Sequence, residues 1–170
     1  MSHRMAVILA VIVTATAAAV ASGAAGGAGT LARVYADSSG VLHVVSPSGE
    51  DRRVAPGVRC DEARLGPDGR TYGALIVHTI DQDPPHHDMI DVRQRLVIWR
   101  DGKKLRSFVP GDFIRTWGFW KDGRQIVLSS GGLHFAGQYQ LFDLATGRVI
   151  DGGEDPITDH SPGWMRSLEP

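Results

Sequence analysis

The feature that most constrains the fold is an internal repeat of strands and tight turns. One hairpin pattern occurs three times, as LHVVSPSGEDRRVAPG, LVIWRDGKKLRSFVPG and QLFDLATGRVIDGG. Each copy has an apolar strand, a turn that carries Gly49, Gly102 or Gly147, and a second strand. Glycine suits these turns because tight hairpins need a positive φ, which other residues adopt at a cost. The repetition predicts a fold that is assembled from similar β units.

A second pattern precedes two of the hairpins and completes the unit. It reads ARLGPDGRTYGALIV and WGFWKDGRQIVLSS, with Asp68-Gly69 and Asp122-Gly123 as the turns. The chain then contains a two-stranded unit and two four-stranded units, and SPGWMRSL is interpreted as the start of a further strand. Four antiparallel strands in about 45 residues is typical of a β-propeller blade. We therefore predict an all-β fold of antiparallel, four-stranded, propeller-blade-like repeats.

These residues resemble a known type of repeat. The stretches LGPDGRTYGALIV and FWKDGRQIVLSS, each followed by a hydrophobic strand and a Gly turn, resemble the WD40-like repeats of TolB-type β-propellers. The resemblance covers about Val34 to Ile150, which is two to three blades, and it includes no catalytic motif. Closed propellers have at least four blades. The resemblance therefore implies an incomplete propeller.

The N-terminus has the order of an export signal. Arg4 precedes the apolar stretch Met5–Ala21, and Ala19 and Ala21 form an A-x-A cleavage site. This order predicts a signal peptide over 1–21, a Gly-rich flexible spacer over 22–33 and a repeat domain over 34–165. An uncleaved membrane anchor is the alternative, because Met5–Ala21 is close to the shortest length that spans a bilayer. Both interpretations predict an extracytoplasmic protein that is secreted, periplasmic or N-terminally anchored.

Composition limits the classes of partner. The formal net charge is −1, which gives no basis for nucleic acid as a partner, and membrane contact is expected only through an uncleaved N-terminus. The Ala, Gly, Arg and Asp bias is typical of a GC-rich bacterial genome. An incomplete repeat array exposes the apolar faces of its end units. The chain is therefore expected either to associate with copies of itself or to cover those faces with its termini.

A His- and Asp-rich stretch between two strands is the candidate metal site. VHTIDQDPPHHDMIDV connects the second and third strands of the middle unit, where the last unit uses only SGGLHFAGQ. Imidazole and carboxylate groups together suit zinc, manganese, nickel or iron. Adjacent histidines point in opposite directions in an extended segment, so one ion would use only one of them. The candidate ligands are His78, Asp81, His86, His87 and Asp88. The simpler interpretation is a solvated acidic loop, and both place it at one end of the fold with His134 and Glu154–His160.

Other catalytic signals are weak. Cys60 is the only cysteine, so no internal disulfide can form, and a buried thiol is the expected state. Ser129 and Ser130 lack a G-x-S-x-G motif. The tryptophans Trp99, Trp117, Trp120 and Trp164 are more typical of core positions than of a ligand platform.

The leading functional hypothesis is an exported, non-enzymatic binding or scaffold module without a cofactor. The sequence does not specify whether its ligand is a protein or a small molecule. A metal-dependent hydrolase or lyase that uses a divalent metal in loop 78–91 is one alternative. A truncated propeller without an activity of its own is the other.

Overall fold

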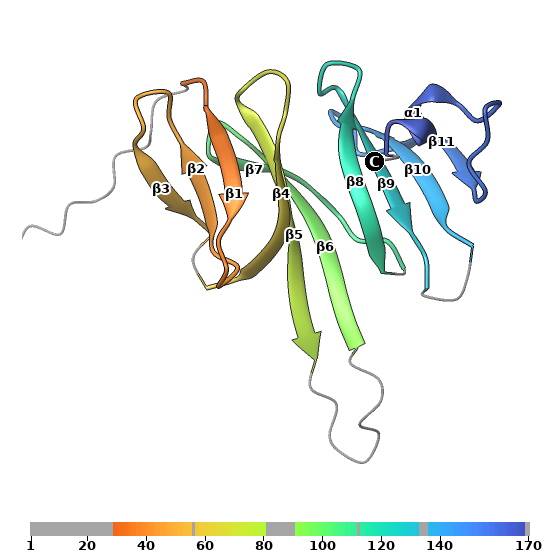
Figure 1. Ribbon diagram of the computed structural model, residues 1–170, viewed down its shortest axis with the longest axis horizontal. Coiled ribbons are helices and arrows are strands. Elements are labelled where there is room, and N and C mark those ends of the chain that lie inside the picture. Colours follow the sequence, from red (N-terminus) through yellow and green to blue (C-terminus); the bar gives the residue numbers. More distant parts are fainter. Residues whose placement is uncertain (1–28, 56, 81–90, 112, 133–135, 169–170) are drawn as a thin grey trace, which may run out of the picture.

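The computed structural model describes residues 29–55, 57–80, 91–111, 113–132 and 136–168. Their strands form three antiparallel sheets that stand side by side along the chain (Figure 1). The first sheet contains β1 (Arg33–Ala36), β2 (Leu42–Val45) and β3 (Asp51–Val54). The second contains β4 (Arg59–Leu65), β5 (Thr71–Ile80), β6 (Asp91–Arg100) and β7 (Lys103–Phe108). The third contains β8 (Ile114–Trp120), β9 (Gln125–Ser130), β10 (Gln138–Asp143) and β11 (Val149–Glu154), and a short helix α1 (Gly163–Arg166) follows.

The sheets have the topology of propeller blades. Within each sheet, strands that are consecutive in sequence pair with each other in antiparallel register, as a meander. The predicted all-β fold of blade-like repeats is therefore confirmed, and the described residues do not close into a ring. The first unit contains one strand more than the repeat predicted, because β1 lies before its hairpin.

The five predicted turn glycines adopt the backbone conformation that the repeat required. Their φ angles are positive: Gly49 87°, Gly69 64°, Gly102 77°, Gly123 79° and Gly147 75°. The turns therefore lie where the repeat placed them.

Replacing Gly147 with valine is expected to lower the free energy of unfolding by about 1–2 kcal/mol, because a β-branched residue is strained at positive φ. Gly152 is the matched control, since it lies in the exposed strand β11, no positive φ is found there, and the nearest atom to a new Cβ would be 3.7 Å away. Urea unfolding of both variants measures the difference. Equal stability of the two variants would show that the turn does not need a glycine.

Two apolar layers hold the three sheets together. Val34, Leu42 and Val44 of the first sheet pack against Tyr72, Ala74, Val97 and Trp99 of the second. On the opposite face of the second sheet, Leu75, Leu96 and Ile98 pack against Trp117, Ile126 and Leu128 of the third. The central strands β5, β6 and β9 are thus covered on both faces, which explains why their apolar runs do not alternate with polar residues.

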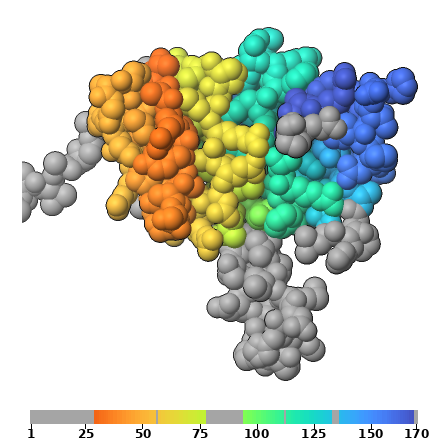
Figure 2. All heavy atoms as spheres, viewed as in Figure 1, coloured from red at the N-terminus to blue at the C-terminus, as the bar shows by residue number. Residues whose placement is uncertain are grey.

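The far face of the third sheet is covered by the C-terminal segment. Trp164 and Met165 of α1 are buried against Val127 and Leu141, whose side chains point away from the second sheet. The prediction that SPGWMRSL begins another strand is therefore wrong. An apolar sheet face had to be covered, and one helical turn presents Trp164 and Met165 to it, whereas an edge strand would have left it exposed. Figure 2 shows this segment at one end of the molecule and β1–β3 at the other.

The outer face of the first sheet is polar instead. His43 of β2 lies between two carboxylates, with Nδ1 2.8 Å from Asp51 and Nε2 3.3 Å from Asp37. Tyr35 donates to Asp51 at 2.6 Å and stacks on His43. The Val41 N–H and the Ser39 hydroxyl lower the pKa of Asp37 to about 2. A face of this chemistry needs no apolar cover, as in the end units of other repeat arrays. The stack therefore has a polar face at one end and a helix-covered face at the other.

In the described part of the chain, no helix is both long enough and apolar enough to cross a bilayer.

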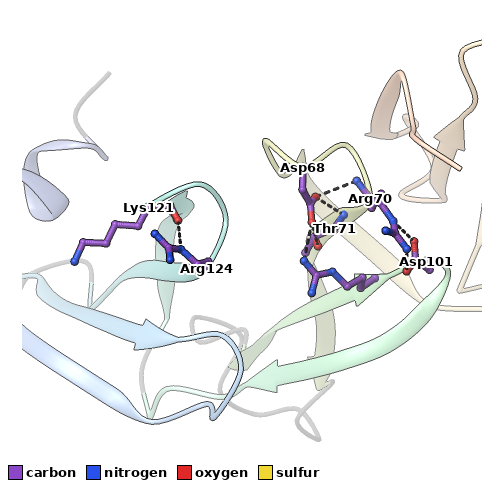
Figure 3. A network of polar contacts seen from close by, with 7 residues as sticks. Asp68, Arg70, Thr71, Asp101, Lys121 and Arg124 are labelled. Carbon is purple, nitrogen blue, oxygen red and sulfur yellow. Dashed lines mark hydrogen bonds and ion pairs between the residues drawn. The ribbon is translucent and has the colours of Figure 1, made fainter. Parts of the chain in front are cut away.

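Asp68 organises the turn between β4 and β5. Its carboxylate accepts hydrogen bonds from the backbone N–H groups of Arg70 and Thr71, from the Thr71 hydroxyl and from Arg100 (Figure 3). Burial alone would raise the pKa of Asp68, but these hydrogen bonds outweigh it and hold the pKa well below its usual range. The ionised carboxylate is therefore the form that stabilises the turn.

Replacing Asp68 with asparagine is expected to lower the free energy of unfolding by about 1–2 kcal/mol at neutral pH. The reason is that hydrogen bonds to a charged acceptor are lost. The pKa of Asp68 is lower in the folded than in the unfolded chain, so its contribution is complete above about pH 4–5 and disappears as the pH falls towards the folded-state pKa. Urea unfolding at several pH values should show the gap between wild type and variant closing in acid. Asp122 holds the same position in the third sheet without a described hydrogen bond to its carboxylate, so Asp122→Asn is the control. A gap that persists in acid would contradict a role for the charge.

Candidate binding groove

The candidate metal ligands lie mostly outside the part of the chain that the structure describes. His78 belongs to β5, where its backbone is paired with Arg93 of β6. Asp81, His86, His87 and Asp88 fall within 81–90, outside the described residues. The metal site therefore stays a prediction. Among the described residues, no three His, Cys, Asp or Glu side chains are grouped so that they could hold a metal ion.

The expected common end of the fold contains part of the predicted acidic group. The strands β5, β9 and β11 finish at the same end of the sheets (Figure 1). Asp155 accepts a hydrogen bond from the Gly137 N–H at 2.6 Å and pairs with Arg115 at 3.1 Å. This carboxylate therefore ties the segment after β11 to the β9–β10 connection. Asp159 and His160 are exposed, and His134 lies outside the described residues.

Cys60 and the tryptophans have structural roles. Cys60 is buried, and burial together with the nearby charge of Asp61 raises the pKa of its thiol to about 11. At neutral pH it is a protonated, inert thiol. Trp99, Trp117 and Trp164 are buried core residues, as predicted, and Trp120 is half-buried beside α1.

A groove lies between the outer strand of the second sheet and the third sheet. It has a volume of about 380 Å³. One wall consists of 107–111, which is the end of β7 and the connection that follows it. The other wall consists of Ser130, Gln138, Gln140 and Phe142. The rings of Phe108 and Phe142 meet at 4.8 Å with a 52° tilt and join the two walls.

The strand pairing explains why these polar side chains point into the groove. In the register of β9 and β10, Gln138 lies opposite Ser130, Gln140 opposite Leu128 and Phe142 opposite Ile126. Leu128 and Ile126 face the second sheet, so all three β10 side chains face it as well. The apolar layer between the sheets ends towards their outer edge. There the side chains of Gln138 and Gln140 line the groove.

The polar groups of the groove have unused hydrogen-bonding capacity. The side chains of Ser107, Ser130, Gln138 and Gln140 make no hydrogen bond to any other residue that the structure describes, whereas each amide can donate and accept. The lining contains no charged side chain. Val109 at the rim is 67% exposed, so an apolar side chain adjoins these polar groups. The groove thus offers neutral hydrogen-bonding groups around an aromatic contact.

The wall that β7 forms is a free sheet edge. β7 is the last strand of its sheet, so one row of its backbone N–H and C=O groups is not paired with a strand of the described chain. The first half of β7 contains the charged residues Lys103, Lys104 and Arg106. Arg106 also donates hydrogen bonds to the carbonyls of Leu144 and Ala145. The end of β7, Ser107–Phe108, has no such charge. Charged residues are a common protection against edge pairing, so the unprotected part is the part that borders the groove.

Sequence reasoning missed this groove. The alternation Gln138-Tyr139-Gln140 shows that both amides share one face of a strand, but neutral side chains give no chemical signal of the kind that His and Asp give. The approach of β7 to β10 depends on how two sheets pack.

The chain was compared with family models, curated proteins and solved structures. No family model matches this chain. No curated protein matches it. Among solved structures, it is similar to the β-propeller domain of the Trilobed protease from Pyrococcus furiosus, described as having an open velcro topology, with 14% identity and a TM-score of 0.46 over 68% of this chain and 34% of that one. The chain thus spans about a third of the length of that neighbour, and its own three meandering sheets are what show its propeller-like fold.

Proposed function

We propose that this chain is an exported, non-enzymatic binding module that holds an extended, uncharged protein segment in the groove between β7 and β10. Its repeats are proposed to be WD40-like repeats of the TolB type, and the apolar segment Met5–Ala21 supports export. The observation that carries the proposal is the combination of a free strand edge with unpartnered amide side chains in one groove.

The chemistry of the groove matches a peptide backbone. An added strand can pair with the free N–H and C=O groups of β7. Gln138 and Gln140 project from the facing wall, and an amide side chain matches both the donor and the acceptor of a peptide group. A charged ligand would find no counter-charge in the lining. Apolar side chains of the ligand would contact Phe142 and the exposed Val109.

The test starts from a displayed library of uncharged heptapeptides that is selected on the full-length protein. A selected peptide is expected to lose at least about tenfold in affinity to Gln138→Ala/Gln140→Ala, which corresponds to about 1.4 kcal/mol. The double variant Arg53→Ala/Arg59→Ala, exposed and distant from the groove in sequence and strand position, is the control and should bind normally. Hydrogen exchange should show slower exchange of β7 amides in the complex.

Each outcome bears on the proposal. A library that yields no binder, or a binder whose affinity is unchanged by the glutamine substitutions, would overturn the groove as the binding site. The first result would favour a truncated propeller without an activity of its own.

A further inference from the structure

A group of exposed basic residues lies at one end of the sheets, which we call the turn end. It consists of the turns at 46–50, 66–70, 101–102, 121–124 and 144–148 and the residues that flank them (Figure 1). All three lysines of the chain, Lys103, Lys104 and Lys121, lie here and are exposed. Exposed arginines of the same end are Arg52, Arg124 and Arg148.

Most carboxylates of the turn end are already engaged. Asp68 pairs with Arg100 at 2.9 Å, and Asp101 pairs with Arg70 at 2.6 Å (Figure 3). Asp143 accepts hydrogen bonds from the N–H and the hydroxyl of Thr146, which hold it within its own turn but do not cancel its charge.

The basic side chains that remain have no such partner. The lysines, and the arginines Arg52, Arg124 and Arg148, form no ion pair with any carboxylate of the described chain. Glu50, Asp51, Asp122 and Asp143 have no Lys or Arg partner in the described chain, so these four carboxylates offset only part of the charge of the six basic side chains. The turn end is therefore positive although the net charge of the chain is −1.

The chain also enters the domain at this end. The Leu31 N–H donates to the Gly69 carbonyl at 2.6 Å, so residues 29–31 lie against the β4–β5 turn. The apolar segment Met5–Ala21 precedes them by only the short stretch 22–28. A stretch of that length reaches at most about 25 Å when fully extended. If the apolar segment is kept as an anchor, the turn end is the part of the domain that is held nearest the bilayer.

We propose that the turn end docks on anionic phospholipid headgroups, next to the retained apolar segment. One apolar anchor and one basic patch are the two signals that stable membrane attachment commonly requires. Each basic residue near an anionic surface strengthens binding by about fivefold. The tether raises the local concentration of the patch at the membrane, so a modest patch is sufficient. The composition predicted no such attraction because net charge does not report how charge is distributed between the two ends.

The lysines report on this surface directly, because no other side-chain amines exist in the chain. Full-length protein is placed in nanodiscs of phosphatidylcholine, with and without phosphatidylglycerol, and acetylated with an amine reagent. Mass spectrometry then measures the modification rate of each lysine. Lys103, Lys104 and Lys121 are expected to react several-fold more slowly when phosphatidylglycerol is present, and high salt should remove the protection. Equal rates in the two lipids would overturn the proposal.

Two variants that lose the same number of positive charges test whether the lysine protection depends on the turn end. Arg124→Gln/Arg148→Gln removes two charges from the turn end, whereas Arg59→Gln/Arg95→Gln removes two exposed charges elsewhere. The first should weaken lysine protection at least about fivefold and the second should leave it unchanged. The same loss in both variants would contradict a local surface. In a parallel experiment, duplex DNA is added to the protein in nanodiscs of phosphatidylcholine alone. If DNA protects the lysines as well as phosphatidylglycerol does, the surface binds polyanions in general and the lipid proposal is overturned.

Discussion

Replacing Trp117 with alanine is expected to lower the free energy of unfolding by about 4 kcal/mol. The side chain is fully buried in the layer between the second and third sheets. Its indole N–H donates to the Glu62 carbonyl at 3.2 Å, and its ring lies edge-on to Phe119 at 5.4 Å. Alanine would leave both a large cavity and an unpaired carbonyl.

The neighbourhood of Trp117 cannot collapse to fill that cavity. A Cβ on Gly73 of β5 would lie 2.7 Å from the indole ring, so the second sheet already approaches the ring as closely as its backbone allows. Closing the gap would require movement of a whole sheet, and such sites give the larger losses in the measured range.

Urea unfolding followed by far-ultraviolet circular dichroism measures the loss without depending on tryptophan fluorescence. Trp120→Ala is the matched control, since this residue is on the same strand but half-buried, and its loss should be smaller. Equal losses in the two variants would show that the layer between the second and third sheets is not the tightly packed core that we describe.

Much of the fold could be predicted because local chemistry determines it. A tight turn needs a positive φ, and the glycines that supply it mark five hairpins in the sequence. Central strands that are buried on both faces are apolar throughout, and β9 is visible for that reason. The strand β1 was missed because it has only four residues, and the turn that follows it, with Gly40 at a φ of 79°, matches neither repeated pattern.

The helix α1 was missed for a different reason. Four residues give too few positions for a helical period, and Trp164 and Met165 fit an apolar strand equally well. What selects the helix is the open face of the third sheet, which is a tertiary feature. Local sequence does not contain that information.

The candidate sites also divide into those that local sequence reveals and those that depend on how the sheets pack. The His- and Asp-rich loop is conspicuous because its groups ionise or bind metals, and it remains a prediction. The groove is built from neutral glutamines and serines on strands from two sheets, so its formation depends on packing. The turn end could have been inferred from the predicted turns, since all three lysines flank them, but net charge obscured it.

The last prediction concerns the helix that covers the third sheet. Replacing Trp164 with alanine is expected to lower the free energy of unfolding by about 3 kcal/mol, near the low end for a buried tryptophan, because a single helical turn at the surface can adjust. The indole is 6% exposed, packs in one cluster with Val127 and Leu141, and donates to Asp151 at 3.1 Å.

The same substitution should change the assembly state. Loss of the indole uncovers part of an apolar sheet face, and exposed faces of repeat units associate. Light scattering should show concentration-dependent association for Trp164→Ala and a monomer for wild type, whose outer face on the first sheet is polar. Arg166→Ala, on the exposed side of the same helix, is the control and should stay monomeric. If Trp164→Ala remains monomeric and loses no stability, α1 is not what covers the end of the stack. If the wild type associates, its end faces are not sufficiently covered.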